Sequence, residues 1–178
     1  MTGLASSDVD GHLTSRATSG HAQFREPRGL WQLTPDGRTA HADELVADLD
    51  GLDLAGAITE QYAEFLVLNG SFKELCGAWQ LKDDAPNDHT DAAYDADVIG
   101  RLATLHDAAA PVVSSFGHTL ERFGPYAGRL GEALARLRDG DTSSFTGVMC
   151  GSYHDVWMEL HEDLILSQGI DRGAEGSF

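Results

Sequence analysis

Apolar residues recur every three or four positions along most of the chain after residue 51. Leu54, Ile58 and Tyr62 are an example, because this spacing places all three side chains on one face of a helix. The same periodicity recurs further along and predicts helices at about 92–123, 126–138 and 151–167. These stretches are expected to pack as an all-α helical bundle over residues 51–170.

A few positions interrupt the helical pattern. Asn69 follows the first apolar run and is expected to cap a second helix that carries Phe72 and Trp79. The polar stretch 82–91 is expected to be a loop. Pro111 lies inside the long helix and is expected to kink it or to split it in two.

The first fifty residues begin with a short helical pattern. Val9, Leu13 and Ala17 recur near helical spacing, which predicts a helix over about 8–19. Its N-cap is expected among Ser6, Ser7 and Asp8, whose side-chain oxygens can accept from the first backbone N–H groups, and Gly20 is expected to end it.

A hairpin and a second helix are expected next. The runs 22–26 and 30–34 alternate in character on either side of a turn at 27–29, which predicts a small β-hairpin. Thr34 then offers an N-cap, and Pro35 suits the first position of a helix because its missing N–H needs no partner there.

The predicted fold class is therefore mainly α, in three parts. A helix, a two-stranded hairpin and a linking helix occupy residues 1–50, and the helical bundle occupies residues 51–170. A tail rich in glycine, residues 171–178, is expected to be loose.

Composition adds the charge to this picture. With 42% hydrophobic residues among its 178, the chain can bury a core, so disorder is not expected. Its 29 acidic residues outnumber its 12 lysines and arginines, and the formal net charge of −17 repels phosphate backbones at long range. Any contact with nucleic acid must come from a local basic patch, for which four arginines are available: Arg16, Arg25, Arg28 and Arg38.

The sequence contains neither a membrane-spanning run nor a secretion signal. No apolar stretch reaches the roughly 20 residues needed to cross a bilayer, and the first eight residues lack the basic and apolar regions of a signal peptide. Cys76 and Cys150 are isolated, so we expect reduced thiols, and two sulfurs cannot close a structural zinc site. We therefore expect a cytoplasmic protein without membrane contact.

The segment 33–38 reads LTPDGR and lies between an aromatic strand and an amphipathic helix. It resembles the signature that closes the wing in MarR-like winged-helix transcriptional regulators of actinobacterial type. Four further segments resemble the helical C-terminal region of that group, so that the likeness extends over nearly the whole chain: 68–73, 79–81, 87–91 and 152–164. On this resemblance, residues 1–50 are a partial winged helix with a recognition helix and a β-wing.

The resemblance implies a DNA-binding regulator that acts as a homodimer and whose helical domain binds a small effector, a partner subunit or both. In such proteins the recognition helix enters the major groove, while wing residues contact phosphates. The residues implied at the DNA interface are Thr14, Ser15 and Arg16 on the helix and Arg25 and Arg28 on the wing.

A second interpretation is also open. A complete winged helix has two helices before its recognition helix, whereas seven residues precede Asp8 here. On this departure and on the acidic charge, the five residues would be solvated surface groups. The protein would then be a non-DNA-binding helical accessory module that binds a partner or a ligand.

Candidate chemistry is densest in the last helix, where His154, Trp157 and His161 share one face. The two histidines are two turns apart, too far for a metal site of the HExxH type. If the 87–91 loop folds over this helix, seven residues would line a ligand pocket: Trp79, Asn87, His89, Tyr94, His154, Trp157 and His161. The alternative is that Asn87 and Asp91 cap helices, His89 is exposed, and Trp157 belongs to the core.

Sequence signatures of enzymes are absent. The chain has no GxxxxGK[ST] loop for phosphates, no GxGxxG after a strand and no GxSxG nucleophile turn. Carboxylates are numerous, but in so acidic a chain their pairing says little. We therefore expect no catalytic residues, no metal and no cofactor.

Overall fold

The structure is a computed structural model that describes residues 5–170, and it divides between Leu52 and Asp53 into two compact units. We call residues 5–52 the N-terminal unit and residues 53–170 the helical unit. The described chain is mainly helical, with two small antiparallel sheets of two strands each. The tail that the sequence predicts to be loose, 171–178, lies outside the described residues.

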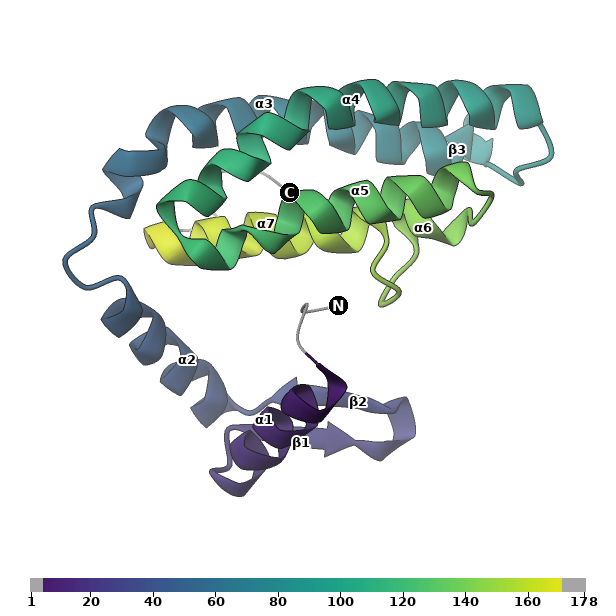
Figure 1. The fold of residues 1–178 in the computed structure, drawn as a ribbon. Coiled ribbons are helices and arrows are strands. Elements are labelled where there is room, and N and C mark those ends of the chain that lie inside the picture. Colours follow the sequence, from purple (N-terminus) through teal and green to yellow (C-terminus); the bar gives the residue numbers. More distant parts are fainter. Residues whose placement is uncertain (1–4, 171–178) are drawn as a thin grey trace. The chain divides into compact units, whose positions relative to one another are not determined.

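The N-terminal unit consists of two helices and a hairpin. Their bounds are α1 Ser6–Thr18, β1 Ala22–Arg25, the short 3-10 helix η1 Glu26–Arg28, β2 Leu30–Leu33 and α2 Pro35–Asp48 (Figure 1). The strands pair antiparallel, with Phe24 opposite Trp31. The order predicted from the sequence, helix, hairpin and helix, is therefore present.

The two helix starts of this unit differ in their capping. The Thr34 hydroxyl oxygen accepts the Gly37 N–H at 3.0 Å, and Pro35 is the first residue of α2, as predicted. The cap predicted for α1 is wrong, because its N-cap is Ala5 without a side-chain bond, and Ser6 and Ser7 already lie in the first turn.

Close packing joins the base of the hairpin to the start of α2. The Thr34 N–H donates to the His21 carbonyl at 3.0 Å, and its hydroxyl donates to the Gly20 carbonyl at 2.7 Å. A Cβ at Gly37 would lie 1.9 Å from the His21 carbonyl oxygen. This contact explains why the position after Pro35-Asp36 is a glycine.

The N-terminal unit buries little of its apolar surface. Within residues 5–52, Ala22 and Gly37 are buried, while Phe24 is 48% and Trp31 36% exposed. α1 buries none of its residues. Short helices and isolated hairpins are marginal in water without such burial, so this unit depends on its local hydrogen bonds.

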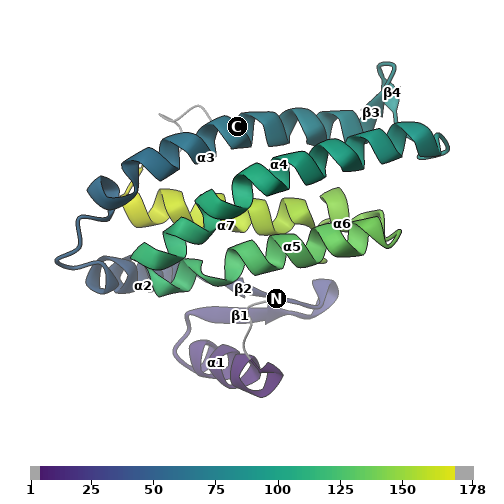
Figure 2. The ribbon, with the colours of Figure 1, turned by 45° about the horizontal axis from the view of Figure 1, so that its top comes forward.

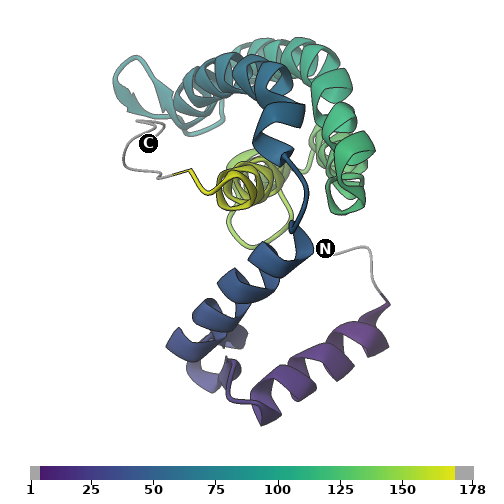
Figure 3. The ribbon, with the colours of Figure 1, turned by 90° about the vertical axis from the view of Figure 1, so that its left-hand side faces the viewer.

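The helical unit contains four long helices. They are α3 Leu54–Gln80, α4 Ala92–Thr119, α5 Pro125–Arg138 and α7 Tyr153–Gln168, joined by β3 Leu81–Lys82, β4 Ala85–Pro86, η2 Glu121–Phe123 and α6 Ser143–Thr146. Successive long helices run in opposite directions, with α3 beside α4 and α5 beside α7 (Figures 1 and 2). The view in Figure 3 shows α3 and α4 as one layer and α5 and α7 as the next. The predicted helical bundle is thus present, but it is not all-α, because β3 and β4 form a small sheet at the start of the stretch predicted to be a polar loop.

Aromatic side chains fill the centre of this bundle. Trp157 of α7 is fully buried, and its ring lies 5.0 Å from that of Phe65 and 4.8 Å from that of Phe72, both on α3. Tyr153 adds a further contact to Phe72 at 5.4 Å. These stacked and tilted contacts hold α7 against α3.

The break predicted at Asn69 is wrong, because α3 continues through it as one helix. Asn69 is buried, and its side-chain oxygen accepts the Trp157 Nε1–H at 2.9 Å. An asparagine whose side chain bonds across to another helix does not compete for its own backbone, and the helix is not interrupted.

α4 is one helix with Pro111 inside it, so the chain is not split there. The helix ends at Thr119, earlier than the predicted residue 123, because η2 takes up residues 121–123. No helix in the described part of the chain combines the length and the apolar character needed to cross a membrane.

Candidate functional site

Two arginines occupy the turn of the N-terminal hairpin. Arg25 ends β1 and Arg28 ends η1, and both are exposed. The Arg25 Nε–H donates to the Gln32 side-chain oxygen at 3.2 Å, which directs one guanidinium along the hairpin. Together with Pro27, these residues line a hollow on the surface of the turn.

Glycine allows this turn to be tight. Gly29 has a φ of 62°, in the left-handed region, and its N–H donates to the carbonyl of Arg25 at 2.9 Å. Phe24 and Trp31 pack across the strands with ring centroids 5.5 Å apart. The tight turn and the aromatic contact therefore fix the backbone that carries the two arginines.

The residues predicted at the DNA interface on α1 are also exposed, but one of them, Arg16, is already paired with an acidic side chain. Thr14 and Ser15 lie on the outer surface of α1. Arg16 forms two parallel hydrogen bonds to Glu44 of α2, from Nη1 to Oε1 at 2.7 Å and from Nη2 to Oε2 at 3.1 Å. This pairing raises the pKa of Arg16 and lowers the pKa of Glu44.

Charge is distributed unevenly along the chain, although both units carry more acidic than basic residues. Residues 11–41 contain four arginines and two acidic residues, Glu26 and Asp36. The helical unit has seven lysines and arginines against nineteen acidic residues. Residues 11–41 are therefore a basic stretch of an acidic protein.

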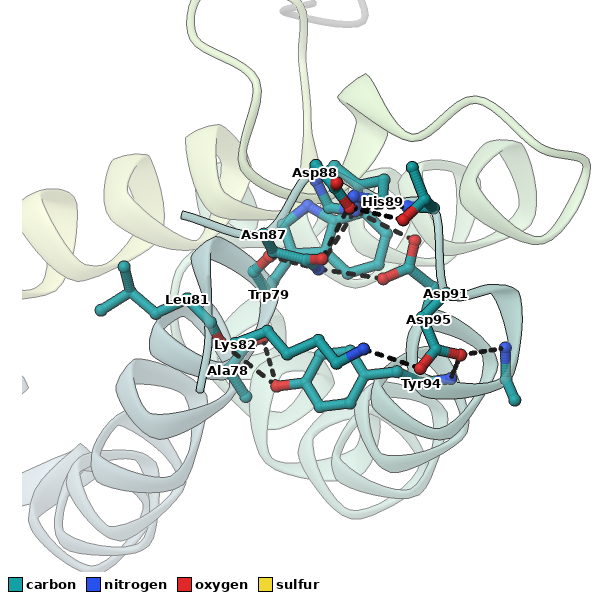
Figure 4. Close-up of polar contacts among 12 residues, drawn as sticks. Ala78, Trp79, Leu81, Lys82, Asn87, Asp88, His89, Asp91, Tyr94 and Asp95 are labelled. Carbon is teal, nitrogen blue, oxygen red and sulfur yellow. Dashed lines mark hydrogen bonds and ion pairs between the residues drawn. The ribbon is translucent and has the colours of Figure 1, made fainter. Parts of the chain in front are cut away.

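A second group of polar residues lies where α3 ends and α4 begins, and we call Trp79, Asn87, His89 and Asp95 the Asp95 cluster. The Asp95 carboxylate is largely buried, and its Oδ1 accepts the Asn87 Nδ2–H at 3.0 Å. Its Oδ2 lies 3.0 Å from the His89 Nδ1 (Figure 4). The His89 ring covers Trp79, with centroids 4.4 Å apart.

The Asp95 cluster also satisfies free backbone carbonyls at the end of α3. Asn87 Nδ2 donates to the Trp79 carbonyl at 3.1 Å, and the Asn87 N–H donates to the Gln80 carbonyl at 2.8 Å, so Asn87 satisfies carbonyls at the end of α3. His89 has a φ of 58°, and its N–H donates to the Asn87 side-chain oxygen at 3.1 Å. These bonds fix the loop between the helices.

Beside the cluster, Asp91 begins α4. Its Oδ1 accepts the N–H groups of Ala93 and Tyr94, each at 3.1 Å, and its Oδ2 accepts from Lys82 Nζ at 2.7 Å (Figure 4). The Tyr94 hydroxyl donates to the Ala78 carbonyl at 2.8 Å. These bonds lower the pKa of Asp91, with the Lys82 bond as the largest cause.

Of the seven residues predicted to line a ligand pocket, three come together here: Trp79, Asn87 and His89. A fourth, Tyr94, bonds the Ala78 carbonyl beside them instead. The other three lie on α7. Trp157 and His161 are buried beside Phe65, and His154 lies near Phe72. Within residues 5–170, no polar contact joins His154 to Asn87 or His89.

Aromatic side chains occupy the space between these two groups. The Phe145 ring of α6 lies 4.9 Å from that of Trp79, and Phe72 lies 6.5 Å from Phe145 and 4.8 Å from Trp157. Sequence reasoning missed α6, and with it the residue that fills this space. It also missed Asp95 and Glu44, because nothing in the sequence distinguishes these two from the other acidic residues.

The remaining chemistry of the described residues is limited. Within 5–170 no group of three or more His, Cys, Asp or Glu side chains is placed to hold a metal ion. Burial raises the pKa of Cys76 to about 12, so its thiol stays protonated at neutral pH. No protein-family model, curated protein or solved structure matches the chain.

Proposed function

We propose that the protein is a transcriptional regulator of MarR-like winged-helix type that binds duplex DNA through its N-terminal unit. The observation that carries this proposal is the exposed pair Arg25 and Arg28 on the braced hairpin, in the basic stretch of an otherwise acidic chain. Arginines at such a position suit phosphate oxygens, because the guanidinium donates two hydrogen bonds in a plane.

In this proposal α1 lies in the major groove and the hairpin lies along the phosphate backbone. Thr14 and Ser15 face base edges, and Arg25 and Arg28 fix the orientation of the protein on the duplex. Two chains bind as a homodimer, and an effector bound to the helical unit shifts the population of the DNA-binding arrangement. The mass of the protein in solution tests the dimer directly.

The test is a titration of labelled duplex with the full chain, read by fluorescence anisotropy between about 50 and 200 mM salt. The duplexes are the region upstream of the protein's own gene and a random sequence of equal length. The variant R25A/R28A removes both hairpin arginines. R101A is the matched control, because Arg101 is an exposed arginine of α4 whose Asp97 contact is 3.9 Å long.

We expect wild type and R101A to bind the upstream duplex more tightly than the random one. Each phosphate contact contributes about 0.9 to the slope of log K against log salt, so R25A/R28A should lower the slope by about 2 for each chain bound to the duplex. Equal slopes for wild type and R25A/R28A, or no preference over the random duplex, would contradict the proposal.

A second candidate function is favoured by a different observation. An apolar groove on α3 and α4 is lined by Glu64, Val67, Leu68, Ala108 and Val112, and Val67 is exposed. In a unit this acidic, the groove favours a non-DNA-binding accessory protein whose helical unit binds a partner or ligand. The same titration separates the two candidates, because this one expects no duplex binding.

A further inference from the structure

The ion pair between Arg16 and Glu44 lies on the surface that the proposed function assigns to DNA. Both guanidinium Nη atoms face both carboxylate oxygens, at 2.7 and 3.1 Å. The two side chains are 47% and 57% exposed, so water and ions reach the pair. An exposed pair of this kind contributes little to folding stability, since solvent screens it.

Three basic side chains influence the carboxylate of Glu44. Arg16 is the main cause of the lowered pKa of Glu44, and His21 and His41 lower it further through their charge. His21 follows α1, and His41 lies one turn before Glu44 on α2. One carboxylate therefore occupies a position among three groups that can carry positive charge.

A phosphate group can accept the same pair of hydrogen bonds from Arg16 as this carboxylate does. The planar guanidinium donates two parallel hydrogen bonds equally well to two carboxylate oxygens or two phosphate oxygens. A duplex phosphate that approaches Arg16 must replace Glu44, and the displaced carboxylate then remains close to the phosphate and repels it.

We propose that Glu44 holds Arg16 in the place of a DNA phosphate and thereby limits the affinity of the N-terminal unit for duplex DNA. This inference rests on the proposed function. Glu44 is not among the residues expected to contact DNA. In this proposal it competes with a DNA phosphate for Arg16. Affinity is then set by the exchange of one anion for another at Arg16.

The experiment measures duplex affinity by anisotropy for wild type, E44Q, R16A and R16A/E44Q. Glutamine keeps the size of the side chain and removes its charge. D43N is the matched control, because it removes the same charge from the next, exposed residue of α2 without removing the ion pair. Far-UV circular dichroism verifies that all variants keep their helix content.

At about 50 mM salt we expect E44Q to bind about fivefold more tightly than wild type for each chain bound, the effect of one unit charge at about 4 Å in water. R16A should bind more weakly and lower the salt slope by about 0.9 for each chain bound. In the R16A background, E44Q should give no more gain than D43N gives in wild type. The gain should shrink at 200 mM salt, because the charges are exposed.

The outcomes separate this inference from the proposed function. If wild type binds through Arg25 and Arg28 but E44Q changes nothing, the role of Glu44 is overturned and the proposed function stands. If the E44Q gain persists in full without Arg16, Glu44 acts only as a general negative charge, and the inference is also overturned. If neither wild type nor E44Q binds any duplex, both are overturned. Binding by E44Q alone supports the competition.

Discussion

The two units of the chain place the same type of residue in opposite environments. Trp157 of the helical unit is fully buried between Phe65 and Phe72, whereas Trp31 of the N-terminal unit is 36% exposed beside Phe24. The helical unit is held by a shared aromatic core. The N-terminal unit is held by caps and backbone bonds at Thr34 and Gly37.

This difference separates stability from the proposed DNA contact. Free energy of folding comes mainly from burial of apolar surface, which is concentrated in the helical unit. The exposed arginines are concentrated in the unit with little core. Substitutions in one unit should therefore change one property and leave the other.

The largest effect is expected from W157A. Removing a buried tryptophan creates a cavity, and we expect the free energy of unfolding to fall by about 3–5 kcal/mol. Urea titration followed by far-UV circular dichroism measures this loss. W31A is the control, because Trp31 is partly exposed and lies outside the helical unit, and the variant should change the same transition by less than about 0.5 kcal/mol. Equal losses in the two variants would contradict the assignment of the stabilising core to the helical unit.

N69L should have the second largest effect. It leaves the buried Trp157 Nε1–H without its acceptor, which costs about 1–3 kcal/mol. The double variant N69L/W157F removes both partners, so its loss should be smaller than the sum of the two single losses in the same urea titration. Additive losses would show that the hydrogen bond does not couple α3 to α7.

D91N should alter the pH dependence of stability. The pKa of Asp91 is lowered in the folded protein, while in the unfolded chain it returns to its ordinary value of 3.8. Its contribution is therefore complete above that pH and is lost as the pH falls through the folded pKa. Urea titrations at neutral and acid pH should show a smaller acid loss for D91N than for wild type. D97N controls for one charge removed from α4, and a D91N profile identical to wild type would contradict the role of the Lys82 pair.

G37A should have the smallest effect on the helical unit and a full effect on DNA binding. Its Cβ would collide with the His21 carbonyl oxygen at 1.9 Å, which separates α2 from the hairpin. We expect loss of duplex binding in anisotropy, with the main urea transition changed by less than about 0.5 kcal/mol. G11A is the control, because nothing lies within 4 Å of a Cβ there. A large shift of the main transition in G37A would show that the units fold together.

Local rules predicted much of the fold from sequence. The Thr34 cap and Pro35 start of α2 depend on neighbouring residues, and both were confirmed. Asn69 was assigned wrongly because its role depends on Trp157, eighty-eight residues away, which no local pattern reveals. The short elements β3, β4 and α6 lack any periodicity that could predict them.

The candidate site was harder to anticipate for the same reason. The loop 87–91 could be recognised as polar, and Asn87 and His89 do lie together. Their partner Asp95 is one of 29 acidic residues, and its burial is a property of the packed helices. The role of Glu44 could not be predicted for the same reason, because its ion pair with Arg16 forms only when α1 and α2 lie close together in the folded chain.

Hydrogen–deuterium exchange of the full chain, with and without duplex DNA, tests the central claim most directly. The account expects DNA to slow exchange in α1 and the hairpin, residues 6–33, while exchange in residues 53–170 keeps its rate apart from surfaces between two copies. Protection confined to the helical unit, or no protection anywhere at duplex concentrations that saturate binding of the upstream sequence, would contradict it.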